Sequence, residues 1–162
     1  KIWCLIMGGP TKYYDYSTKN MKHIFSIFYK LLKKNDFQLV VIPSMRTPLN
    51  TIHYAKEFFG ENHTVIMNVD KKAYLSALAL SENIIVTCDS SSMISEAALT
   101  GKPSYIANIL PKKNDIRFQR FRNLFRELNI TRNLGEDMEN WSYQSLDETN
   151  RVAKIINEKI KN

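Results

Sequence analysis

Cysteine and histidine are scarce in this chain of 162 residues, which holds two cysteines and three histidines. Cys4 and Cys88 both fall in apolar, strand-like runs, so we expect two buried thiols in a reducing compartment, which favours the cytoplasm. The histidines share no ligand spacing with each other or with the cysteines, which argues against zinc. We therefore expect no disulfide framework, no metal and no resident cofactor.

Long hydrophobic runs are also absent. No apolar run approaches the ~20 residues of a membrane-spanning helix, and the opening segment 1–7 is too short for the core of a signal peptide. With 44% hydrophobic and 24% charged residues, the composition is that of an ordinary soluble domain. We expect residues 1–162 to form one domain. Because the chain begins directly on an apolar strand, we also expect it to be the C-terminal part of a longer, two-domain protein.

Basic residues are in excess, and the formal net charge is +7. Such a charge suits nucleic acid, an anionic membrane surface or a phosphorylated ligand, and charge alone does not choose among them. A solvated, Lys-rich surface is the plain alternative. We expect no specific binding of nucleic acid, and we keep peripheral contact with a membrane or a lipid acceptor as an expectation.

Short β-branched runs alternate with segments of helical period, which indicates an α/β fold with a parallel sheet and helices on both faces. Five strands are predicted, at 2–7, 37–42, 64–67, 84–88 and 104–107. Six helices are predicted, the first capped by Ser17 or Thr18 and the others at 48–60, 71–80, 91–100, 114–128 and 146–160. We expect the last helix to turn four apolar side chains toward the core: Val152, Ile155, Ile156 and Ile160.

In open α/β sheets, ligands bind outside the carboxyl ends of the strands, so the residues that follow the strands carry the functional prediction. Gly8 and Gly9 follow the first strand and would allow positive φ angles and close approach of a ligand to the backbone. A tight turn is the alternative. Neither a G-x-G-x-x-G fingerprint nor a P-loop is present.

Arg46 follows the second strand in a short loop with Ser44 and Thr47 beside it. A planar, permanently charged guanidinium at this place suits bidentate recognition of phosphate. The alternative is an arginine that only staples the loop to the surface. We take Ser44, Arg46 and Thr47 as candidate binding residues.

The segment 89–103 after the fourth strand is the strongest candidate. Its serines, Ser90, Ser91 and Ser92, would place hydroxyls beside the free N–H groups at the start of a helix, which is an anion site. N-capping explains one serine and leaves two without a role. Glu96 does not have the spacing of a capping box, so its carboxylate is expected to accept hydrogen bonds from ribose hydroxyls. A serine-hydrolase triad is disfavoured because no G-x-S-x-G elbow exists.

Three motifs in this order resemble a known family. They are Gly8-Gly9-Pro10, Ser44-x-Arg-Thr-Pro48 and Asp89-Ser-x-Ser-Met-x-Ser-Glu96-Ala-x-x-Thr-Gly101-Lys-Pro103. Together they resemble the mitochondrial-fission Elm-type family, whose bacterial branch is described as glycosyltransferases. The resemblance covers roughly residues 2–128.

The segment 92–103 is more distantly similar to the donor-binding helix of GT-B glycosyltransferases and of UDP-N-acetylglucosamine 2-epimerases. The resemblance implies a Rossmann-like domain that equals the C-terminal half of a GT-B enzyme and binds a nucleotide-sugar donor as substrate. It implies that Glu96 binds ribose, that Ser91 and Ser92 with Gly8 and Gly9 hold the diphosphate, and that Arg46 holds a phosphate.

In the plant branch, the resemblance implies a different role, the recruitment of a dynamin-like protein to mitochondria. Two functions therefore stay open, a nucleotide-sugar-dependent glycosyltransferase and a non-catalytic scaffold that keeps the fold. A scaffold would contact its partner or a membrane through basic side chains such as Lys112, Lys113, Arg117 and Arg120. The sequence identifies no catalytic base, and in GT-B enzymes that group generally comes from the other domain.

Overall fold

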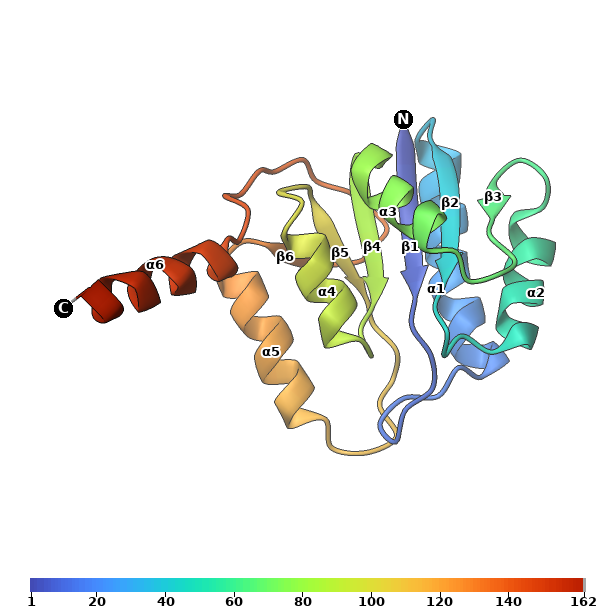
Figure 1. Cartoon of the computed structure of the whole chain (residues 1–162). Coiled ribbons are helices and arrows are strands. Elements are labelled where there is room, and N and C mark those ends of the chain that lie inside the picture. Colours follow the sequence, from blue (N-terminus) through green and yellow to red (C-terminus); the bar gives the residue numbers. More distant parts are fainter. Residues whose placement is uncertain (162) are drawn as a thin grey trace.

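Six strands form one parallel sheet in the order β3-β2-β1-β4-β5-β6. Figure 1 shows this sheet in the computed structural model of the chain, which describes residues 1–161. The strands are β1 (Ile2–Met7), β2 (Gln38–Pro43), β3 (Thr64–Val65), β4 (Asn83–Thr87), β5 (Ser104–Ala107) and β6 (Thr131–Asn133). The interior strands β1, β4 and β5 are almost wholly buried, because helices or connecting segments cover both faces. The predicted α/β class with a parallel sheet is confirmed.

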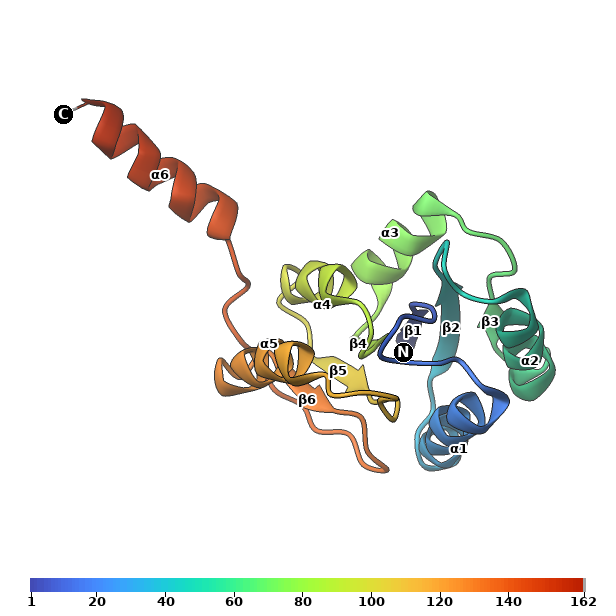
Figure 2. The same cartoon turned by 90° about the horizontal axis from the view of Figure 1, so that it is seen from below.

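Six helices accompany the sheet. They are α1 (Thr18–Lys34), α2 (Leu49–Phe59), α3 (Lys71–Leu80), α4 (Ser91–Ala98), α5 (Ile116–Glu127) and α6 (Glu148–Lys161). Seen from below the sheet, α1 and α2 cover one face and α3, α4 and α5 the other (Figure 2). This arrangement leaves the carboxyl ends of the strands open at one edge of the sheet.

Helix α1 forms as its sequence predicts. The Ser17 side chain accepts a hydrogen bond from the Asn20 N–H and so caps the first turn. The helix buries one stripe of residues at three-and-four spacing. These are Met21, Ile24, Phe25, Phe28 and Leu31. Phe25 and Phe28 pack against Phe59 of α2, so the two helices on this face share one aromatic core.

Segment 134–147 contains no helix or strand and takes the place of a helix over β5 on the face of α1. The Tyr105 hydroxyl donates to the Glu139 carbonyl and accepts from the Glu139 N–H, both at 2.8 Å. Trp141 packs edge-on against Tyr105, and two lysines of α1 form ion pairs with the segment. The short β6 before it was not predicted, because three residues are too few to show a strand period.

Helix α6 corrects one prediction. Its apolar side chains Val152, Ile155, Ile156 and Ile160 are 44%, 40%, 50% and 77% exposed, and the helix stands away from the sheet (Figures 1 and 2). The helical spacing of apolar residues predicts that a helix has an apolar side, but it does not predict which segment covers that side. Among the helices of residues 1–161, none combines the length and the apolar character needed to cross a membrane.

Both cysteines are free and buried, as predicted. Cys4 lies in the middle of β1 and Cys88 directly follows β4. Burial raises the pKa of each thiol to about 11.

Candidate functional site at the switch point of the sheet

The predicted residues gather at the carboxyl edge of the sheet, where β1 and β4 lie side by side. From these two strands the chain continues toward opposite ends of the sheet, which makes their junction the topological switch point of a doubly wound fold. Gly8 and Gly9 leave β1 at this point and Asp89 leaves β4, while Arg46 comes from the loop after the neighbouring β2. This is the place where open α/β sheets bind ligands.

Asp89 is the centre of the junction, and its side chain is fully buried. Its Oδ2 accepts hydrogen bonds from the Gly9 N–H at 3.0 Å and from Arg46 Nη2 at 3.1 Å. Its Oδ1 accepts from the Tyr16 hydroxyl at 2.6 Å. Burial, and then the charge of Asp89, raise the pKa of Tyr16 well above its ordinary range. Asp89 therefore ties three loops together and has no exposed oxygen to offer a ligand.

The two glycines are required by the protein itself. Neither has the positive φ that the sequence suggested, since Gly60 and Gly101 are the glycines with positive φ. The Gly8 N–H donates to Thr87 Oγ1 at 2.8 Å, so both glycine N–H groups are already used within the junction. A Cβ atom on Gly9 would meet the Arg46 carbonyl oxygen at 2.1 Å. The glycines thus allow close packing between loops, and not free N–H groups for a phosphate.

Arg46 bridges the junction and still reaches solvent. Its Nη1 donates to the Gly9 carbonyl at 3.0 Å, and its side chain remains 44% exposed. Thr47 is buried and donates its hydroxyl to the Met7 carbonyl at 2.9 Å, while the Ser44 N–H donates to Thr47 Oγ1 at 2.8 Å. Ser44 and Thr47 therefore shape the loop, and Arg46 is its exposed charge.

The serines after Asp89 divide into two roles. Ser90 is the N-cap of α4, and its side chain accepts from the Met93 N–H. Ser91 and Ser92 are exposed in the first turn. With Ser95 they line a groove of about 400 Å³ between α4 and α5, and Arg117 of α5 lies across it. Arg117 was expected only as part of a basic surface, because nothing in the sequence places α5 beside α4.

Glu96 lies on α4 five residues beyond Ser91, which is about 7.5 Å along the helix axis. The Tyr74 hydroxyl of α3 donates to Glu96 Oε2 at 2.5 Å. Burial, and then the hydrogen bond to Glu96, raise the pKa of Tyr74. The cap of α4 is Ser90, six residues earlier, so Glu96 takes no part in capping. Tyr74 is a site residue that the sequence did not reveal.

The structure therefore brings Gly8, Gly9, Arg46 and Asp89 into direct contact, and places Ser91, Ser92 and Glu96 on the helix that starts beside them. Within the described residues, no three His, Cys, Asp or Glu side chains gather as a group that could hold a metal ion.

The strand order and the helices on both faces define a Rossmann-like α/β domain. The chain belongs to the mitochondrial fission ELM1 family, whose model matches residues 1–160. It is 30% identical over 162 residues to the uncharacterised protein RP120 of Rickettsia prowazekii, covering 94% of this chain and 45% of that protein. It is 34% identical over 118 residues to the mitochondrial fission protein ELM1 of Arabidopsis thaliana, covering 70% of this chain and 27% of that protein. The chain thus spans less than half the length of these relatives.

Solved structures of UDP-GlcNAc 2-epimerases share the fold. The Methanocaldococcus jannaschii enzyme, in complex with UDP-GlcNAc and UDP, superposes with a TM-score of 0.59 at 16% identity, over 97% of this chain and 45% of that chain. The Neisseria meningitidis enzyme, bound to UDP-GlcNAc, gives a TM-score of 0.52 at 16% identity, over 98% and 35%. At such identities the likeness concerns the fold alone.

Proposed function

We propose that this chain binds the nucleoside diphosphate of a nucleotide sugar, as the donor-binding domain of a GT-B-type glycosyltransferase. One arrangement carries the proposal. Ser91 and Ser92 open α4 beside the groove that Arg117 lines, Arg46 lies at the adjoining junction, and Glu96 stands farther along the same helix. Solved structures of this fold that hold UDP-GlcNAc support the choice of ligand class.

The start of α4 suits the diphosphate. Its first N–H groups lack partners within the helix, and the helix dipole favours a negative charge there. The exposed hydroxyls of Ser91 and Ser92 add hydrogen-bond donors beside these N–H groups. Arg46 and Arg117 would supply the charge that balances the phosphates, with Arg46 held in place by Asp89.

Glu96 suits the ribose. A carboxylate accepts hydrogen bonds from two adjacent hydroxyls, and its exposed position keeps it within reach of a ligand. The hydrogen bond from Tyr74 fixes one carboxylate oxygen and leaves the other free. We infer that Tyr74 orients Glu96 toward the ribose.

Transfer of the sugar would place negative charge on the departing diphosphate. Preorganised donors at the start of α4 and the two arginines would stabilise that charge as it develops. The acceptor site and the base that takes the acceptor's proton would be supplied by other parts of a longer protein, as the greater length of the relatives allows.

The alternative is a non-catalytic scaffold that retains the fold, and two observations favour it. The chain belongs to a family whose description refers to mitochondrial fission. In addition, the N–H groups of Gly8 and Gly9 already donate hydrogen bonds within the protein. In that case the basic residues of the surface would contact a protein partner or a membrane.

A thermal-shift screen against UDP, GDP, CMP, ADP and their sugars separates the two functions. A ligand present at a hundred times its dissociation constant stabilises the fold by about 2.7 kcal/mol, which is readily measured. We expect one nucleotide class to raise the melting temperature, and Glu96→Gln to weaken its binding about tenfold because a charged acceptor is lost. Glu127→Gln, which removes another exposed carboxylate, at the far end of α5, is the control. A flat screen with every nucleotide would favour the scaffold.

A further inference from the structure

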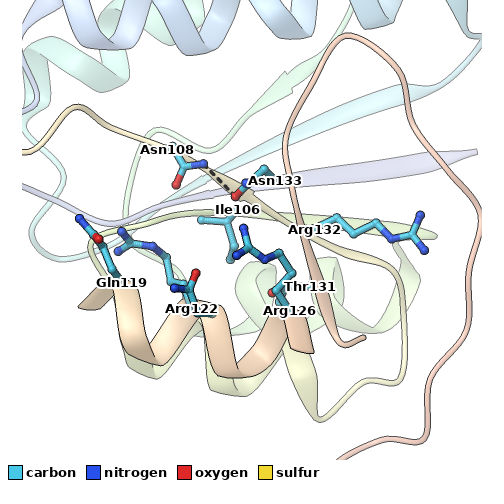
Figure 3. A pocket seen from close by; sticks show the side chains of 9 residues that line it. Ile106, Asn108, Gln119, Arg122, Arg126, Thr131, Arg132 and Asn133 are labelled. Carbon is cyan, nitrogen blue, oxygen red and sulfur yellow. Dashed lines mark hydrogen bonds between the residues drawn. The ribbon is translucent and has the colours of Figure 1, made fainter. Parts of the chain in front are cut away.

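A second polar pocket lies between α5 and the strand ends of β5 and β6 (Figure 3). It has a volume of about 220 Å³, and its polar walls include Asn108, Gln119, Arg122, Arg126 and Asn133. It shares no residue with the groove at the start of α4. The proposed nucleotide site therefore leaves this pocket unexplained.

Arg122 is fixed at one end of the pocket. Its Nη2 lies 3.0 Å from Asp115 Oδ2, and its Nη1 donates to the Tyr14 hydroxyl at 2.8 Å and to the Cys88 carbonyl at 3.2 Å. The side chain is only 14% exposed. Burial of Asp115 opposes its ionisation, yet hydrogen bonds from Tyr14, Arg122 and Gln119 lower its pKa. This buried ion pair holds the guanidinium in one orientation without a ligand.

Arg126 carries the charge that is not neutralised. It lies one helical turn after Arg122, so the two stems are neighbours about 5–6 Å apart on one face of α5. Within residues 1–161 it forms no ion pair and no side-chain hydrogen bond. In Figure 3 its side chain points from α5 toward Asn133, whereas Arg132 turns away to the opposite side. Arg132 forms an ion pair with Glu139, whereas the charge of Arg126 is not neutralised by any carboxylate of the described residues.

Two amides complete the pocket. Asn108 Nδ2 donates to Asn133 Oδ1 at 2.9 Å, which fixes how both side chains point (Figure 3). Asn133 keeps an N–H₂ group for a ligand oxygen, and Asn108 keeps a carbonyl oxygen for a ligand hydroxyl. The donors therefore outnumber the acceptors around a net positive charge, which is the environment that a phosphate group needs.

We propose that this pocket is a second anion site, which binds the phosphate group of a phosphate monoester. A neighbouring pocket of about 530 Å³ shares Asn108, Gln119 and Arg122 with it and is walled by the apolar Leu110 and Pro111. The organic part of the ester lies against that apolar wall, and its phosphate lies between Arg122 and Arg126. The inference does not depend on the nucleotide site at α4.

The test uses the whole chain with inorganic phosphate and with phenyl phosphate as probes. We expect saturable one-to-one binding by calorimetry, and tighter binding of phenyl phosphate because its ring reaches Leu110. In ¹H–¹⁵N spectra, the shifted amides should cluster at 108, 126 and 133. Arg126→Gln should weaken binding about tenfold or more, because a charge-assisted hydrogen bond is lost. Arg120→Gln, on the same helix but outside the pocket, should bind as the parent chain does.

A second variant distinguishes the loss of a ligand contact from local unfolding caused by the substitution itself. Asn133→Asp is nearly isosteric and keeps the oxygen that accepts from Asn108, but it places a carboxylate against the phosphate. It should weaken binding at least as much as Arg126→Gln. Asn157→Asp, which makes the same charge change on the exposed α6, controls for net charge. Unchanged binding in both pocket variants, or amide shifts confined to α4, would overturn the proposal.

Discussion

Gly8 and Asp89 lie so close together that a Cβ atom on residue 8 would be 2.1 Å from Asp89 Oδ2. Real Cβ atoms essentially never come within 3.0 Å of another heavy atom. The carboxylate cannot move aside easily, because Gly9, Tyr16 and Arg46 all donate to it. The loops after β1 and β4 therefore pack directly against each other at the switch point. This packing fixes the distance between α4 and the loop after β1.

Gly8→Ala should therefore lower the free energy of unfolding by about 1–3 kcal/mol, the usual cost of overpacking a buried site. Urea unfolding measures this change. Gly135→Ala is the matched control, because its Cβ would meet nothing within 4 Å and its φ is not positive. It should change stability by no more than about 0.5 kcal/mol. Equal effects of the two substitutions would show that the packing at Gly8 is looser than the contact indicates.

The contact between Gly8 and Asp89 illustrates which features could be predicted from the sequence and which could not. Apolar runs gave β1 and β5 with their observed bounds, because a strand buried on both faces is marked by its own residues. The polar residues after the strands were also expected together, since parallel strands end at one edge. Their individual roles were not predictable. Whether Gly8 faces a ligand or Asp89 depends on a contact across 81 positions of sequence.

Distant partners account for the other differences. Tyr16 and Tyr74 support Asp89 and Glu96 through hydrogen bonds over 73 and 22 positions of sequence. On α5, Phe125 is buried, whereas the adjacent Leu124 is 51% exposed. The local sequence pattern identifies helices and their apolar sides. Which segment packs against an apolar side depends on the tertiary structure.

Because the thiols are buried, we expect the free energy of unfolding to fall at alkaline pH. Burial raises the pKa of Cys4 from 9.0 to about 11. Between these two pH values the unfolded chain has lost a thiol proton that the folded chain keeps, so the free energy of unfolding falls as pH rises through this window. Below pH 9 the contribution of the thiol is fully present.

Urea unfolding of the parent chain and of Cys4→Ala, at pH 8 and at pH 10.5, tests this linkage. The parent chain should lose more stability between the two pH values than the variant does. Tyr14 and Tyr16, whose pKa values burial also raises, titrate in both proteins and cancel in the comparison. The same loss in the two proteins would mean that Cys4 is less protected from solvent than its burial indicates.

The exposed side of α6 allows a last comparison between two identical substitutions. Ile156 is 50% exposed on α6, whereas Ile24 is 1% exposed on α1. Ile24→Ala should cost about 2–5 kcal/mol, because it leaves a cavity in the core. Ile156→Ala removes no buried contact and introduces a better helix former, so the free energy of unfolding should change by less than about 0.5 kcal/mol. Both values come from urea unfolding under one set of conditions. A loss above about 1 kcal/mol for Ile156→Ala would contradict the exposure of α6 and restore the inward orientation that its helical period had suggested.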